Sequence, residues 1–202
     1  MARKFLVCAL LAGLLFACAK SEKDGGNGEM PRIDGKRVLM IIAYQNFRDE
    51  ELLQPKGLLE KQGATVTLAS SQLGVASGML GAKATVDILV KDVKVSDYNA
   101  VIFVGGSGAD EYWDDATAQA IVTETVNTGK LLCAICIAPV TLAKAGVLKG
   151  KRATVFSSER GKLEAEGAIY TGKNVEVDGK IITANGPNAA AEFARAIMKA
   201  LQ

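Results

Sequence analysis

Apolar residues in this chain gather into short continuous runs, and segments with helical periodicity lie between them. The segments 37–43, 100–104 and 131–135 are almost wholly apolar, which is typical of strands buried on both faces of a sheet. Further strands are expected at 64–69, more loosely at 84–90, and at 153–156. Mixed apolar and polar segments predict helices at 52–62, 110–128, 138–145, 159–166 and 187–201.

Glycines and one turn signal support this division of the chain. Gly63, Gly129 and Gly146 each follow a predicted helix directly, as expected for residues that end helices in a left-handed conformation. The segment 174–184 predicts a hairpin whose turn contains Asp178-Gly179. Strands that alternate with helices, with one antiparallel hairpin, predict a three-layer α/β sandwich around a mainly parallel sheet.

The chain has 202 residues, and about 170 of them follow Ile33, enough for one domain with its own core. No internal repeat is visible. We expect three parts: a signal segment at 1–17, a polar tether at 18–35 and one α/β domain at 36–202.

The first residues resemble a bacterial lipoprotein signal. Arg3-Lys4 precede roughly 13 apolar residues, too few for a bilayer span of about 20. Leu15-Phe-Ala-Cys18 resembles a lipobox, so we expect Cys18 to carry the lipid; an ordinary secretory signal is the alternative. Because two or more acyl chains anchor a protein stably, we expect a lipid-anchored envelope protein that faces the periplasm or lies at the outer membrane.

Charge and residue counts exclude several classes of function. The chain has 24 Lys and Arg against 22 Asp and Glu, and loss of Arg3 and Lys4 leaves equal numbers. With no basic block, nucleic acid is not an expected partner. The chain has no histidine, and its four cysteines include Cys8 and Cys18, so a disulfide framework, a Cys-His-Asp triad and a tetrahedral zinc site are not expected. We expect no metal and no cofactor.

Cys136 stands where the strand 131–135 runs into the helix 138–145. This is the position of a nucleophile elbow, with small Ala134 and Ala138 on either side. A helix N-terminus favours thiolate over thiol, so we expect a reactive sulfur. Cys133 completes a C-x-x-C pattern, but residues three apart on a strand lie about 10 Å apart. We therefore expect Cys133 in the core, on the opposite face from Cys136.

Two further features follow neighbouring strands. Glu51 comes after the first strand, at the mouth of a helix whose first turn would hold Pro55, and Gly105-Gly106 come directly after 100–104. The carboxyl ends of parallel strands share one edge, so these residues are expected near Cys136. A protonated Glu51 would hydrogen-bond the sulfur, and backbone N–H groups of the glycines would stabilise an oxyanion. The alternatives are a solvated helix-terminal charge and a plain turn.

Several of these motifs together resemble the PfpI superfamily, which includes the parkinsonism-associated deglycase. Ala134-Ile-Cys-Ile-Ala-Pro139 is similar to its elbow, Glu51 and Pro55 to its acid-proline pair, and 101–106 to its strand and Gly-Gly segment. The end of the chain, at 177–187 and 193–197, is similar to its deglycase-like branch. The resemblance covers nearly all of 36–202. It implies a flavodoxin-like sandwich of the class I glutamine-amidotransferase type, and a homodimer.

The resemblance also implies roles for residues. Cys136 would be the nucleophile, Glu51 its protonated partner, and Gly106 with Ile137 the backbone donors. Family activities include conversion of methylglyoxal to lactate, deglycation, chaperoning, peroxide sensing and peptidase action. The peptidase branch has histidine where this chain has Ile137, and the deglycase branch commonly has one near Phe156; Ala138 replaces a usual glycine. These departures disfavour a peptidase and weaken the glyoxalase interpretation less.

The leading hypothesis is an envelope enzyme that uses Cys136 on small reactive carbonyls or on the adducts that they form with proteins, in the manner of a glyoxalase or deglycase. A non-catalytic redox sensor or holdase chaperone, in which Cys136 is oxidised to sulfinate and held by Glu51, is the alternative. A binding module that kept the fold without chemistry also stays open. Glutamine amidotransferase action is disfavoured because its histidine is missing.

Overall fold

The computed structural model describes residue 1 and residues 30–202 of the chain. The predicted signal segment, its lipid-carrying Cys18 and the first part of the tether lie outside the described residues. Within the described part, no helix is both long enough and apolar enough to cross a bilayer.

A seven-stranded sheet forms the centre of the domain, and it is parallel throughout except for one edge strand, β11, which runs antiparallel to β12. The strands, in their order across the sheet, are β11 (Val175–Asp178), β12 (Ile181–Ala184), β8 (Leu131–Ile135), β7 (Ala100–Phe103), β1 (Arg37–Ile41), β3 (Thr65–Ser70) and β6 (Ile88–Leu89). This confirms the predicted flavodoxin-like α/β sandwich.

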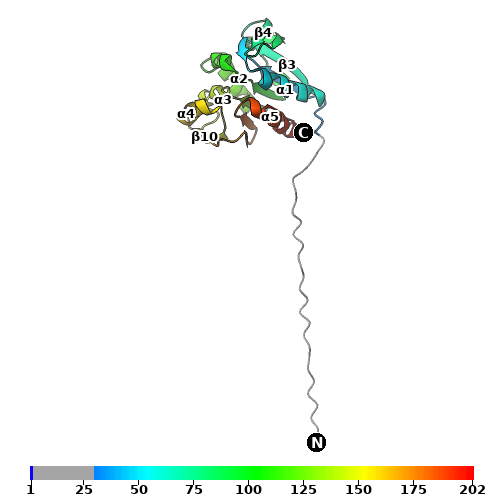
Figure 1. Ribbon diagram of the computed structural model, residues 1–202, viewed down its shortest axis with the longest axis vertical. Helices are drawn as coiled ribbons and strands as arrows, with labels where there is room; N and C mark the ends of the chain where they lie inside the picture. Colours follow the sequence, from blue (N-terminus) through cyan, green and yellow to red (C-terminus); the bar gives the residue numbers. More distant parts are fainter. Residues whose placement is uncertain (2–29) are drawn as a thin grey trace.

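Helices cover both faces of the sheet, which is why the central strands are apolar at consecutive positions. The helices are α1 (Asp49–Lys61), α2 (Ala116–Asn127), α3 (Pro139–Lys144), α4 (Arg160–Ala165) and α5 (Ala190–Ala200). In Figure 1, α1 and α5 lie side by side, and both pack against the face that carries Val38 and Met40. The other three helices pack against the face that carries Leu39 and Ile41.

Within residues 30–202, short 3-10 turns complete the connections: η1 (Val90–Asp92), η2 (Val95–Asp97), η3 (Ser107–Tyr112), η4 (Ser157–Glu159) and η5 (Pro187–Ala189). The C-terminus lies beside the start of the described chain in Figure 1, near the amino end of β1. The connections that follow β1, β7 and β8 lie at the opposite end of the sheet.

A second, three-stranded sheet lies apart from the central one, with β4 at the top of Figure 1. It consists of β2 (Gln45–Phe47), β4 (Gly74–Gly78) and β5 (Lys83–Val86). The buried carboxylate of Asp49 accepts the backbone N–H groups of Leu80 (2.9 Å) and Ala82 (2.7 Å). Because these residues lie in the turn between β4 and β5, Asp49 holds the hairpin, including Met79, against the start of α1.

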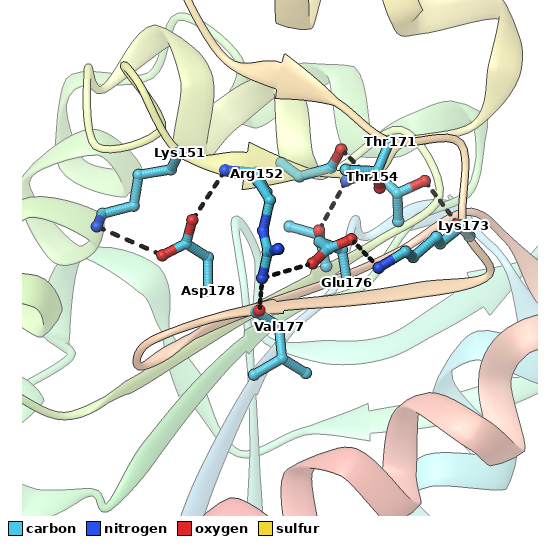
Figure 2. Close-up of polar contacts among 10 residues, drawn as sticks. Lys151, Arg152, Thr154, Thr171, Lys173, Glu176, Val177 and Asp178 are labelled. Atoms are coloured by element: carbon cyan, nitrogen blue, oxygen red, sulfur yellow. Dashed lines mark hydrogen bonds and ion pairs between the residues drawn. The ribbon is translucent and has the colours of Figure 1, made fainter.

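Side chains at the other edge of the molecule attach a short parallel pair, β9 (Arg152–Ala153) and β10 (Ile169–Tyr170), to β11 and β12. Figure 2 shows the buried Glu176 between Arg152 (3.4 Å) and Lys173 (3.0 Å). The backbone N–H of Arg152 donates to Asp178, and that of Thr154 donates to the hydroxyl of Thr183, both at 2.9 Å. The segment that leads from β9 toward Phe156 is therefore fixed at several points.

The predicted elements are present, with differences at three boundaries. The prediction that α1 begins near Leu52 is wrong: it begins at Asp49, so Pro55 lies inside the helix and not in its first turn. The predicted helix 110–128 begins only at Ala116, because the Asp115 carboxylate accepts the N–H of Ala118 at 2.7 Å and caps the helix there. The strand expected at 153–156 is limited to β9, because the chain then turns toward the end of β8.

Candidate active site

Cys136 follows β8 in a left-handed conformation, with φ of +64°. Such a backbone costs of order 1–3 kcal/mol in a residue other than glycine and persists only where neighbours fix it. Here the Cys136 N–H donates to Ala184 (2.9 Å), and its C=O accepts the N–H of Phe156 (2.8 Å). The sharp turn predicted for a nucleophile elbow is therefore present and anchored on both sides.

The turn changes which face of the sheet the thiol joins. Residues alternate between the two cores along β8, and continued alternation would place Cys136 with Leu132 and Ala134. Instead the thiol packs in the same core as Cys133 and Ile135. The prediction that the two cysteines point to opposite faces is wrong, because the left-handed residue rotates the sulfur toward the α1 side. Both cysteines are free, and Cys133 is fully buried, as expected for a core residue.

Glu51 lies in the first turn of α1 and is fully buried. The solvated alternative is therefore excluded. Within the described part of the chain, neither carboxyl oxygen has a hydrogen bond of ordinary geometry. The polar groups that act on the carboxyl are the Cys136 thiol and the Gly105 N–H. A buried acid with so few partners is costly unless it is protonated.

Gly105 and Gly106, which follow β7, allow the start of α1 and the turn after β8 to approach closely. A Cβ on Gly105 would lie 2.4 Å from both the Cys136 Cβ and the Glu51 Oε2, so no side chain fits between acid and sulfur. A Cβ on Gly106 would lie 2.3 Å from the backbone nitrogen of Arg48, and its φ of +105° also favours glycine. Both positions therefore require glycine because a side chain would clash with Glu51, Cys136 or Arg48, which a plain turn would not demand.

Burial dominates the electrostatics of Glu51. It raises the pKa of this carboxyl from 4.5 to about 8, and the smaller opposing effects come from the Cys136 thiol, the charge of Arg48 and the Gly105 N–H. Glu51 is therefore protonated at neutral pH, which agrees with the role that the sequence resemblance implies.

The pKa of the Cys136 thiol differs from the prediction. Burial, followed by the negative charge that Glu51 can carry, raises the pKa of Cys136 to about 12, although the N–H groups of Gly106 and Ile137 lower it. The expected resting thiolate is thus wrong: α3 begins three residues later, at Pro139, and spans six residues, and its N-terminus does not offset burial. The free site holds a thiol beside a carboxylic acid, and the pair loses its first proton near pH 8.

Of the three residues predicted as backbone donors, two act on the sulfur. Gly106 and Ile137 direct N–H groups at it, whereas the N–H of Gly105 acts on Glu51. The Trp113 indole N–H donates to the carbonyl of Ile137 at 3.3 Å and holds this peptide in place. Gly106 and Ile137 are therefore placed to stabilise an oxygen that becomes negative when the sulfur attacks a carbonyl.

A cavity of about 350 Å³ opens above the pair, and Cys136 is 8% exposed to it. Its walls are mostly apolar side chains: Met79, Trp113, Ile137, Phe156 and Pro187. Arg48 also lines the cavity, but it forms a two-bonded ion pair with Glu50 at 2.8 and 3.0 Å. Among the described residues, no group of three or more Cys, Asp or Glu could hold a metal ion.

Sequence reasoning missed several residues that shape this cavity. Trp113 offered a weak signal as the single tryptophan of the chain, and Phe156 was noticed only as the place of a missing histidine. Asp49 and Met79 offered none, because an acid in the first turn of a helix is ordinary and the hairpin that it holds was not predicted.

Comparison with known proteins places the domain among relatives. A family model described as DJ-1/PfpI matches residues 36–200. An uncharacterised protein of Methanocaldococcus jannaschii is 41% identical over 87% of each chain. A deglycase of Pyrococcus abyssi is 30% identical over 82% of this chain and 99% of its own, and a glutathione-independent glyoxalase of Caenorhabditis elegans is 27% identical over 83% and 89%.

Among solved structures, a ThiJ/PfpI domain protein from Brachyspira murdochii superposes with a TM-score of 0.81. It is 32% identical and covers 83% of this chain and 98% of its own. The likeness extends over the domain that carries β1, β7, β8 and the residues at their carboxyl ends.

Proposed function

The chain belongs to the DJ-1/PfpI family, and on that premise we propose that it is a cofactor-independent cysteine enzyme. Its substrates would be small reactive carbonyls, or the adducts that they form with protein amines. Relatives named as deglycases and as a glyoxalase support an enzyme at the level of the family. The observation that carries the proposal is the burial of Glu51 against Cys136 beneath an open cavity.

The reaction begins with one proton transfer. When the Glu51 carboxyl is ionised it accepts the thiol proton, and the sulfur adds to the aldehyde carbon of the substrate. A C–S bond forms, the carbonyl π bond opens, and the N–H groups of Gly106 and Ile137 stabilise the oxygen until Glu51 returns the proton to it. The product of this step is a hemithioacetal.

With a 2-oxoaldehyde, Glu51 then moves the proton from the former aldehyde carbon to the neighbouring carbon, and the hydroxyl proton passes to the oxygen of that neighbouring carbon. The hemithioacetal becomes the thioester of a 2-hydroxy acid, and water cleaves it to the free acid and the thiol. The oxidation of one carbon balances the reduction of the other, so no external redox partner is needed. With an amine adduct, the sulfur displaces the amine, which leaves with a proton, and the same hemithioacetal forms.

Replacement of each cysteine tests the proposal. We expect wild-type protein to convert methylglyoxal to lactate, Cys136→Ala to lose the activity, and Cys133→Ala to keep it, because Cys133 lies in the core beneath the site. The measurement is lactate formation with chirally resolved product. Full turnover by Cys136→Ala, or none by freshly reduced wild-type protein, would exclude this function.

A redox sensor is a second candidate, favoured by the limited exposure of Cys136 beside a protonated carboxyl. Sulfinate oxygens at this position would accept the Glu51 hydrogen. Under mild peroxide, mass spectrometry should then find sulfinate on Cys136 and not on the fully buried Cys133. Equal oxidation of both cysteines would exclude a dedicated sensor.

We also propose that the protein is a lipid-anchored homodimer of the cell envelope. The tether joins the domain near the amino end of β1, away from the cavity at the carboxyl ends of the strands, so anchoring would leave the site accessible. Cys18→Ala should move the protein from the membrane fraction to the soluble fraction. Sedimentation equilibrium of the domain alone should give twice the mass of one chain; a single-chain mass would exclude the dimer.

A further inference from the structure

One large apolar side chain stands between two cavities. Phe156 is 42% exposed, and its backbone N–H donates to Cys136 at 2.8 Å, which fixes its position beside the sulfur. The ring lines the 350 Å³ cavity and also a neighbouring one of about 240 Å³. A Cβ on Gly186 would lie 3.3 Å from the ring, so the backbone supports its other side.

The cavity above Cys136 exceeds the needs of the smallest dicarbonyls. Its volume is that of roughly ten liquid water molecules, and a methyl group would cover only part of the apolar wall. Phe156, Trp113 and Met79 form that wall together with Ile137 and Pro187. A larger apolar substituent would displace water from these side chains and gain binding free energy in proportion to the area covered.

The charges around the cavity disfavour an anionic substrate. Arg48 is the cation that lines it among the described residues, and Glu50 already occupies its guanidinium. Lys162 lies 4.9 Å from the centre of the Trp113 ring and pairs with Glu159 at the rim. The exposed carboxylate of Asp110 adds a further negative charge at the mouth. A substrate carboxylate would therefore meet the acids Asp110 and Glu159, and an arginine whose Nε and Nη2 already bond Glu50.

We propose that Phe156 is a specificity-determining residue, and that the site selects uncharged carbonyl compounds with an aromatic or other bulky apolar substituent. The substituent packs against Phe156 and the Trp113 side of the cavity while the aldehyde carbon lies over Cys136. This inference rests on the proposed function and goes beyond it, because it orders carbonyl substrates by size and charge.

Three 2-oxoaldehydes test the order: phenylglyoxal, methylglyoxal and the anion 4-carboxyphenylglyoxal. The activity is followed as formation of the hydroxy acid, which excludes signals from reaction of phenylglyoxal with arginine. We expect kcat/KM for phenylglyoxal to exceed that for methylglyoxal by about 10- to 100-fold, the effect of burying an aromatic substituent. 4-Carboxyphenylglyoxal should be a poorer substrate than phenylglyoxal, because it adds a carboxylate to the same ring.

Variants of Phe156 test the assignment of the residue. Phe156→Ala should lower the ratio of phenylglyoxal to methylglyoxal activity about tenfold, and Phe156→Leu, which retains an apolar wall, should lower it less. Ile169→Ala is the matched control, because Ile169 is also a large exposed apolar residue, 54% exposed, but lies on β10 and does not line the cavity. Its ratio should equal that of the wild type.

The outcomes separate this inference from the function on which it rests. Equal activity toward the two glyoxals, or a ratio unchanged in Phe156→Ala, would overturn the inference and leave the carbonyl chemistry of Cys136 intact. Preference for 4-carboxyphenylglyoxal over phenylglyoxal would overturn the part of the inference that concerns charge. Failure of reduced wild-type protein on all three compounds would overturn the proposed function itself.

Discussion

Two glutamates in the described part of the chain are almost completely buried, and their surroundings have opposite effects on the carboxyl pKa. Glu51, at the carboxyl ends of the strands, has no cation paired with it, and burial raises its pKa to about 8. Glu176, on the edge strand β11, is also removed from water, yet its pKa is lowered. Burial alone would raise the latter pKa too, but hydrogen bonds from Lys173 and Thr171 and the charges of Lys173 and Arg152 outweigh it.

The difference shows how the same buried side chain takes opposite protonation states in two places of one fold. Figure 2 shows Glu176 held between two long basic side chains, so it stays ionised at neutral pH and ties β9 to β11. Glu51 has lost its water without gaining such partners. It therefore keeps a proton at neutral pH and can release it near the pH at which cells operate, as a proton carrier for a neighbouring sulfur must.

The largest effect should be on catalysis. We expect Glu51→Gln to lower kcat/KM for 2-oxoaldehydes by about 10²- to 10⁴-fold, because the amide cannot accept the thiol proton. Glu176→Gln should keep most of the activity, since Glu176 touches neither the sulfur nor the cavity. Steady-state kinetics of the two variants side by side make the measurement. Similar losses in both would mean that Glu51 contributes only by holding the fold.

The next largest effect is on the free energy of unfolding, and the pKa of Glu51 fixes how it changes with pH. Because the pKa of Glu51 is raised in the folded protein, the protonated carboxyl contributes to stability. That contribution to the free energy of unfolding is fully present below pH 4.5 and is lost as pH rises toward 8. Glu51→Gln removes this cost and should raise the free energy of unfolding at pH 8 on the order of 4 kcal/mol, with little change at pH 4.

Urea titrations at the two pH values measure this difference. Leu52→Ala, in the same turn of α1, is a control that should destabilise the domain at both pH values alike, because Leu52 is apolar and buried. A gain in Glu51→Gln that does not depend on pH would show that the carboxyl is ionised in the native state.

Alkylation of the thiol should follow the first proton lost by the pair. Below pH 8 the rate constant for iodoacetamide should rise about tenfold per pH unit and then level off, whichever of the two groups gives up the proton. In Glu51→Gln the inflection near pH 8 should disappear, whereas Glu176→Gln should retain it. An inflection near pH 5 in the wild type would instead mean that a thiolate rests in the free site.

Sequence patterns predicted the layers of the fold and the proximity of Cys136 and Glu51. They did not predict where α1 begins or which face of the sheet Cys136 joins. Continuous apolar runs identify strands covered on both sides, and the ends of parallel strands must share an edge. Pro55 misplaced the start of α1, because proline favours the first turn of a helix, whereas here it lies inside a helix that begins at Asp49. The face of Cys136 depends on one left-handed residue that no periodicity reveals.

Glu176 illustrates a further limit of sequence patterns. In Val175-Glu-Val-Asp178, alternation would normally place the valines inward and the acids in water. In the structure, Val177 and Glu176 have the opposite placement: Val177 is 44% exposed and Glu176 is 3% exposed. The cations that make this possible come from β9 and from the loop before β11, so only the assembled fold shows why an acid is acceptable there.

The smallest effects should come from this edge of the sheet. Because the pKa of Glu176 is lowered, its stabilisation is present above its ordinary value of 4.5 and is lost as pH falls through the lower, folded value. This is the opposite pH dependence to that of Glu51. We expect Glu176→Gln to cost about 1–2 kcal/mol at pH 7, and Lys173→Ala less than about 1 kcal/mol, since Lys173 is 60% exposed and Arg152 still pairs with the acid.

Glu164→Gln provides the comparison for a pair on the surface, because Glu164 and Arg160 are both well exposed and one helical turn apart. It should change stability by only about 0.3–0.5 kcal/mol. If Glu176→Gln lowered the free energy of unfolding no more than Glu164→Gln does, the cations around Glu176 would only compensate the cost of burying its charge. They would then add no net stability. A loss that grows above pH 5 and vanishes in acid would show instead that a buried carboxylate, once paired, stabilises the edge to which Phe156 and the site are attached.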